Sequence, residues 1–159
     1  MATVTKWIPA SVEDVWAILA DPRGYAFWVV GSHTIRSVDG HWPGVGSTFH
    51  HTQGHGPIKV NDTTTVIEAD PPHRLLLEVR IRPFLTGPVE LQLRPDGEGT
   101  CVTITERAKG GVAGLAPHFL TAPFIALRNA DALRRLSAMA WARAAALERA
   151  PDDLSAATT

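Results

Sequence analysis

Apolar and polar residues alternate along much of this chain, and a period of two is the pattern of a strand with one buried face. A first strand is predicted over residues 3–8, where Pro9 ends it. Short turns rich in Gly, Pro and Asp separate the later alternating segments, so we expect those to form an antiparallel meander. These later strands are predicted over residues 33–38, 47–53, 59–68, 74–82, 87–94 and 100–109.

After the first strand, the spacing of apolar residues changes to three and four, which predicts a helix. Val12, Val15 and Leu19 would share one face of a short helix that follows Ser11, a favourable N-cap residue. The aromatic-rich residues 25–28 are predicted to form a second short helix or a loop.

Residues 116–150 are rich in Ala, Leu and Arg and are predicted to form one long helix. Proline is tolerated in a first turn, so the helix is expected to start at 121–123. An alternative is a start near Pro117 with a kink at Pro123. The small and polar residues 151–159 are predicted to be a flexible tail.

A long amphipathic helix and a sheet with one apolar face must each bury that surface. We therefore expect a single α+β domain over residues 1–150. Its predicted core is a curved seven-stranded antiparallel sheet wrapped around the long C-terminal helix, with two short helices after the first strand. A gap between such a sheet and its helix is suited to binding a small molecule.

Composition narrows the function classes. The 159 residues are 45% hydrophobic and 19% charged, and the net charge is −1, so no basic field is present to recruit nucleic acid. Cys101 is the single cysteine, which excludes a disulfide within the chain. No signal-peptide pattern or run of about 18 apolar residues is found. We expect a soluble, cytoplasmic protein with no stable membrane insertion.

Five features of the chain are characteristic: ASVEDVWAILAD at 10–21, GVGSTF at 44–49, VIEADPPHRL at 66–75, TCVTI at 100–104, and Asn129 in the last helix. Together they resemble the SRPBCC superfamily, which has the START-like or helix-grip fold, and in particular its polyketide cyclase/dehydrase and lipid-transport family. The resemblance implies a helix-grip ligand-binding domain with a cavity for an apolar ligand such as a lipid, sterol or polyketide. Some members of the superfamily are cyclases or dehydratases and many are carriers, so the resemblance leaves the activity open.

Alternation assigns the side chains that face the cavity, because a slip of one residue would expose every apolar side chain of a strand. With the helix and aromatic positions added, the predicted ligand-binding residues are Trp28, Phe49, Gln53, Leu75, Leu77, Val79, Ile81, Val89, Leu91, Val102, Ile104, His118, Phe124, Ile125 and Asn129.

Two titratable residues are candidates for acid–base catalysis. Alternation carries His51 inward with Phe49, and it carries Glu106 inward with Ile104 if the strand has no bulge. A buried Glu106 must be paired, protonated or near the cavity mouth, whereas at a strand end it would stay solvated. His51 is either a polar residue at the rim or in the interior, or a proton donor or acceptor for a ligand carbonyl. Trp42 lies in a turn-rich loop and is a candidate gate.

No metal or other cofactor is expected. His50 and His51 are adjacent on a strand, so their side chains point to opposite faces and cannot bind one ion without a bulge.

The sequence is compatible with three functions. The first is a carrier or binding protein for a hydrophobic small molecule. The second is a polyketide cyclase, aromatase or dehydratase that uses cavity acid–base residues. The third is a protein-interaction module of the co-chaperone type. A monomer and a homodimer are both compatible with the sequence, because the apolar residues at 117–127 suit either a cavity mouth or an interface.

Overall fold

The computed structural model describes the backbone of residues 1–55, 58–83 and 85–156. It also describes the side chains of these residues, except those of 54, 55, 58, 113, 118 and 150–156. The strands are β1 Ala2–Ile8, β2 Ser32–Asp39, β3 Thr48–His55, β4 Ile58–Asp70, β5 Arg74–Ile81, β6 Leu85–Asp96 and β7 Gly99–Glu106. The helices are α1 Val12–Leu19, the 3-10 helix η1 Pro22–Gly24, α2 Tyr25–Trp28, α3 Val112–Leu115 and α4 His118–Ala156.

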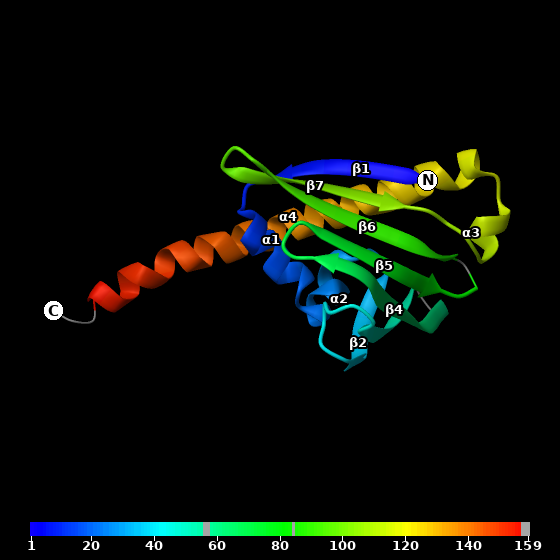
Figure 1. Ribbon diagram of the computed structural model, residues 1–159, viewed down its shortest axis with the longest axis horizontal. Helices are drawn as coiled ribbons and strands as arrows, with labels where there is room; N and C mark the ends of the chain where they lie inside the picture. Colours follow the sequence, from blue (N-terminus) through cyan, green and yellow to red (C-terminus); the bar gives the residue numbers. More distant parts are fainter. Residues whose placement is uncertain (56–57, 84, 157–159) are drawn as a thin grey trace.

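The strands form one antiparallel sheet in the order β1-β7-β6-β5-β4-β3-β2 (Figure 1). Strands β2 to β7 therefore follow one another as a meander, and β1 pairs with the last of them. Figure 1 shows α4 crossing one face of this curved sheet, while the short helices α1 and α2 lie near the same helix. The predicted α+β helix-grip fold is confirmed.

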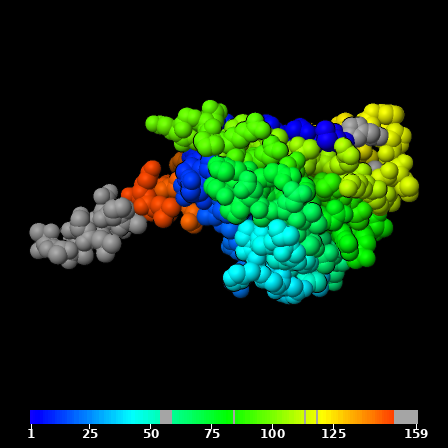
Figure 2. All heavy atoms as spheres, viewed as in Figure 1, coloured from blue at the N-terminus to red at the C-terminus, as the bar shows by residue number. Residues whose placement is uncertain are grey.

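The main core lies between the inner face of the sheet, the short helices and α4. On α4 the buried residues Ala132, Leu133, Leu136 and Ala140 recur at three- and four-residue spacing, so they form one stripe that faces the sheet and α1. Figure 1 shows the C-terminal part of α4 extending beyond the sheet, and Figure 2 shows the rounded body that the sheet and the short helices form.

The register of the sheet sets which polar residues face inward. Phe49, His51 and Gln53 alternate along β3 and are all buried, and His51 lies opposite Asp62 of β4. Glu106 lies between its partners on β1 and β6 and is fully buried, because β7 has no bulge within its named ladders.

The predicted elements differ from the observed ones mainly at their ends. The last strand stops at Glu106 rather than 109, because the chain then turns beside β6, where Lys109 N–H donates to the carbonyl of Thr86. Helix α4 begins at His118, near the alternative start at Pro117. The predicted tail overlaps the end of α4, residues 157–159 lie outside the described residues, and tail flexibility stays a prediction. Among the described residues, no helix is long and apolar enough to cross a membrane.

Candidate functional site

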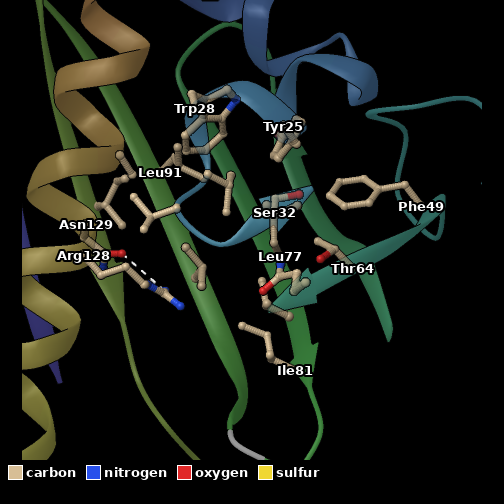
Figure 3. Close-up of a pocket in the computed structure, with 17 residues that line it drawn as sticks. Tyr25, Trp28, Ser32, Phe49, Thr64, Leu77, Ile81, Leu91, Arg128 and Asn129 are labelled. Atoms are coloured by element: carbon tan, nitrogen blue, oxygen red, sulfur yellow. Dashed lines mark hydrogen bonds between the residues drawn. The ribbon is translucent and has the colours of Figure 1, made fainter. Parts of the chain in front are cut away.

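A cavity of about 50 Å³ lies between the inner face of the sheet, α2 and α4 (Figure 3). Most of its wall is apolar. A water molecule needs roughly 10–15 Å³ of such space, whereas pockets for drug-sized ligands typically measure a few hundred Å³. The cavity therefore accepts a small apolar group as it stands, and a larger ligand requires α4 and the sheet to move apart. The apolar wall consists of Trp28, Val29, Val30, Phe49, Leu77, Val79, Ile81, Val89, Leu91, Ile104 and Ala132.

One side of the cavity carries a polar cluster on α4. Arg128 and Asn129 line the wall, and Figure 3 shows them on the opposite side from Phe49 and Thr64. Behind them, Glu106 Oε2 accepts a hydrogen bond from Asn129 Nδ2 at 2.9 Å and another from Arg128 Nη2. Arg128 Nη2 also donates to Asn129 Oδ1 at 3.3 Å. The three side chains thus form a closed ring of hydrogen bonds.

The helix repeat explains how two adjacent residues of α4 both reach the cavity. Asn129 lies four residues after the buried Ile125, and Arg128 lies four residues before the buried Ala132. Both therefore belong to the apolar stripe of α4. Glu106 has no exposed surface, and its Oε1 makes no hydrogen bond within the described part of the chain. A carboxylate buried this deeply must be paired, and Arg128 supplies the opposite charge.

On the other side of the cavity, Thr64 carries a hydroxyl in the wall. Its Oγ1 lies 3.1 Å from Nε2 of His51, which is fully buried behind the wall. Burial lowers the pKa of His51, although the nearby Thr63 backbone and the charge of Asp62 oppose that change. The imidazole is therefore neutral near pH 7, and its Nδ1 has no hydrogen-bond partner among the described residues.

A second buried carboxylate lies near His51. Asp62 accepts hydrogen bonds from the backbone N–H of Arg82 at 2.8 Å and from its Nε at 3.1 Å. Burial by itself would raise the pKa of Asp62, but the hydrogen bonds from Arg82 lower it below its usual value. Asp62 therefore stays ionised, and its hydrogen bonds to Arg82 hold the chain at the end of β5.

Aromatic residues close the end of the cavity near α2. Tyr25 packs against Trp28 and Phe49, with ring centroids 4.9 Å apart in both pairs. Trp42 packs 4.7 Å from Phe49 and donates from Nε1 to the carbonyl of Leu19. Trp42, the candidate gate, lies behind Phe49 with its indole N–H bound to α1, and its gating role stays a prediction.

The structure brings together most of the predicted ligand-binding residues. Those that line the cavity are Trp28, Phe49, Gln53, Leu77, Val79, Ile81, Val89, Leu91, Ile104 and Asn129.

Other predicted ligand-binding residues lie elsewhere. Leu75 and Val102 face inward but are packed in the core beside the cavity. Ile125 packs with Ala2 and Leu85 in a separate small cluster. The side chain of Phe124 is 72% exposed, so it does not face the cavity. The side chain of His118 is outside the described residues.

The candidate catalytic residues His51 and Glu106 both face inward, so Glu106 is not solvated. Neither lines the cavity wall, and each is separated from it by one hydrogen-bonded neighbour, Thr64 for His51 and Arg128 or Asn129 for Glu106. Their catalytic roles stay a prediction.

Several polar residues of the wall were missed from the sequence. Arg128 carries a recognisable signal, since it is a charged residue at a stripe position of an amphipathic helix. Thr64 and the buried Asp62 are two residues apart on β4, so their side chains lie on the same face of the sheet. Alternation along β4 is therefore a signal that could have placed Thr64 inside. Tyr25 and Ser32 reach the cavity through the local path of α2 and its following turn, for which the sequence carries no periodic signal. No group of three or more potential metal ligands occurs among the described residues.

Several large apolar residues of α3 and the start of α4 are exposed and do not line the cavity between the sheet and α4. They include Leu115, which is 89% exposed, and Phe119, Leu120, Phe124 and Leu127. The alternatives of a cavity mouth and an interface stay open for this surface.

Comparison with known proteins agrees with the fold. A family profile described as "Polyketide cyclase / dehydrase and lipid transport" matches residues 1–140. No curated protein matches the chain.

Solved structures of similar fold include a crystal structure from Rhodobacter sphaeroides with 24% sequence identity and a TM-score of 0.67, covering 88% of this chain and 90% of that one. A Nitrosomonas europaea protein has 15% identity and a TM-score of 0.68, covering 86% and 91%. A Chromobacterium violaceum protein has 18% identity and a TM-score of 0.66, covering 86% and 94%. Identities this low support the fold alone.

Proposed function

Because this chain belongs to the polyketide cyclase/dehydrase and lipid transport family, we propose that it binds a hydrophobic small molecule between the sheet and α4, as a carrier or binding protein. The observation that supports this proposal most directly is the apolar cavity with a few polar groups at its sides. Binding is favoured over catalysis because the titratable candidates His51 and Glu106 are held behind the wall by hydrogen bonds. A ligand would bury its apolar body against β5, β6 and β7.

The cavity volume explains why binding must involve movement. A lipid-like ligand exceeds about 50 Å³, so α4 has to shift from the sheet when the ligand enters. A larger apolar side chain that fills the remaining space should therefore weaken ligand binding, and it does so without adding a charge to the wall. Ala132 is suitable, since it lies in the wall on α4 and is nearly fully buried.

The test compares Ala132→Leu with Ala138→Leu. Ala138 lies on the same helix but is exposed, so the second variant makes the same chemical change away from the cavity. Binding is measured by fluorescence titration with N-phenyl-1-naphthylamine, an uncharged apolar probe, and folding by circular dichroism. We expect Ala132→Leu to weaken probe binding at least about tenfold, equal to ~1.4 kcal/mol, with Ala138→Leu unchanged.

If folded Ala132→Leu binds the probe as tightly as the wild type does, the cavity is not the binding site. Native mass spectrometry of the purified protein provides a second readout, since a co-purified small molecule should be present in the wild type and depleted in Ala132→Leu.

A further inference from the structure

The cavity contains one guanidinium whose charge is already balanced from behind. The side chain of Arg128 is 19% exposed and lies in an otherwise largely apolar wall, and Glu106 behind it has no exposed side-chain surface. An ionised Arg128 and an ionised Glu106 sum to zero charge. The pair is therefore a neutral unit that presents hydrogen-bond donors to the cavity.

The donors available to a ligand follow from the hydrogen bonds of Arg128. Its Nη2 is used by Glu106 Oε2 and Asn129 Oδ1. Its Nε and Nη1 make no hydrogen bond within the described part of the chain, although a guanidinium carries five N–H donors in total. Figure 3 shows the Arg128 side chain directed along the cavity rather than away from it. Three N–H groups thus remain for an acceptor atom of the ligand.

The neutral pair distinguishes charged from uncharged acceptors. A carboxylate bound to Arg128 would place a second negative charge close to Glu106 in a site of low polarity, leaving the group with a net charge of −1. A ketone, ester or alcohol oxygen accepts the same hydrogen bonds and adds no charge. The apolar wall then covers the rest of the ligand in either case.

We propose that Glu106 determines the charge specificity of the cavity: by neutralising Arg128, it makes the site select apolar ligands that end in an uncharged oxygen and reject the matching carboxylates. This inference rests on the proposed binding function and specifies the ligand class of that site. Glu106 acts here as a positioning residue, because it contacts Arg128 and Asn129 and does not line the cavity itself.

The ring of hydrogen bonds explains why the charge selectivity should depend on Glu106 in particular. Asn129 donates to Glu106 and accepts from Arg128, so it holds the two charged groups in one arrangement. Replacing Glu106 by Gln keeps the size and the acceptor oxygen but removes the charge. Arg128 then becomes an unbalanced cation in the wall, and a carboxylate becomes its natural partner.

The experiment measures the affinities of 1-dodecanol and dodecanoate, which have the same chain length, by displacement of N-phenyl-1-naphthylamine at pH 8. We expect the wild type to bind 1-dodecanol at least tenfold more tightly than dodecanoate. In Glu106→Gln we expect the ratio of the two affinities to shift by at least tenfold toward dodecanoate. Glu78→Gln is the matched control, because Glu78 lies on β5 outside the cavity wall and should leave the ratio unchanged.

The double variant Glu106→Gln with Arg128→Gln should lose the gain in dodecanoate affinity, because the cation is then absent. Glu106→Leu serves as a second variant if Glu106→Gln does not fold, since it removes the charge with an apolar side chain of similar size.

The outcomes separate the two proposals. If both ligands bind and the ratio is the same in the wild type and the Glu106 variants, the charge-specificity inference is wrong and the binding function stands. A wild type that prefers dodecanoate also overturns the inference. If the wild type binds neither the probe nor either of the two ligands, the proposed binding function fails.

Discussion

Nε2 of the buried His51 lies 3.1 Å from the hydroxyl of Thr64, which lines the cavity. The histidine therefore orients a wall hydroxyl instead of reaching a ligand itself. If Nε2–H is the donor in this pair, the Thr64 hydroxyl hydrogen is free to point into the cavity. Burial lowers the pKa of His51, so near pH 7 the imidazole is neutral and only one of its two ring nitrogens carries a proton.

The lowered pKa of His51 predicts a pH-dependent stability. Burial is the main cause of the lowered pKa of His51. As the pH falls through about 6.5, the unfolded chain therefore binds a proton at this residue before the folded chain does. Stability should thus be complete above about pH 6.5 and be lost as the pH falls below it. The slope from this one group is at most about 1.4 kcal/mol per pH unit.

His51→Gln should reduce that slope, since Gln can still hydrogen-bond Thr64 but does not titrate. The measurement is urea denaturation at several pH values between 5 and 7.5. His50→Gln is the control, because His50 is partly exposed on the opposite face of β3 and pairs with Asp39. Equal slopes in the wild type and His51→Gln would show that folding does not change the pKa of His51.

Thr64→Val tests the same hydrogen bond from its other side. The change keeps the shape of the side chain but leaves His51 without its partner in a buried position. We expect a loss of about 1–3 kcal/mol in the free energy of unfolding. Thr64→Ser keeps the hydroxyl and should recover most of that loss, whereas a Ser variant as unstable as the Val variant would assign the effect to the lost methyl group.

Tyr25 and Trp42 donate to one carbonyl, that of Leu19 at the end of α1, at 3.0 Å and 2.9 Å. Each single variant, Tyr25→Phe or Trp42→Phe, leaves the carbonyl with one donor. We expect the loss of the hydroxyl in Tyr25→Phe to cost about 0.5–1.5 kcal/mol.

The double variant should cost more than the sum of the two single ones, because only it leaves the buried carbonyl without a side-chain donor. A double-mutant cycle by chemical denaturation measures this coupling. Strict additivity would mean that water satisfies the carbonyl in the variants.

Asp62 and Arg82 predict a different pH effect. The pKa of Asp62 is lowered by Arg82 against the opposing effect of burial, so the stability it supplies is present above the usual carboxyl pKa and is lost as the pH falls through the folded value. Arg82→Gln should lower the Tm at pH 7 and make unfolding in acid begin at a higher pH. Arg80→Gln on the exposed side of β5 is the control. An unchanged Tm in Arg82→Gln would show that the backbone N–H of residue 82 alone holds the carboxylate.

The local pattern of apolar and polar residues was sufficient to predict the strands and helices and the residues on the inner face of the sheet. Period-two alternation placed Leu77, Val79 and Ile104 in the wall, because a strand has only two faces and the apolar one must be buried. The same reasoning turned Glu106 inward against the usual preference of a carboxylate for water. The pattern of the helix was not sufficient for Phe124. An Ala- and Leu-rich helix has apolar residues on more than one face, and its composition does not say which face meets the sheet.

The amino-acid sequence by itself determined the helix-grip topology, since alternation, turn residues and helix spacing act over a few neighbouring positions. Tertiary structure alone decided how small the cavity is and which polar groups reach it. Arg128 comes from α4 and Glu106 from β7, and they meet because the helix crosses the sheet at one place. That crossing is set by the sum of packing contacts over the whole core, which no local pattern contains.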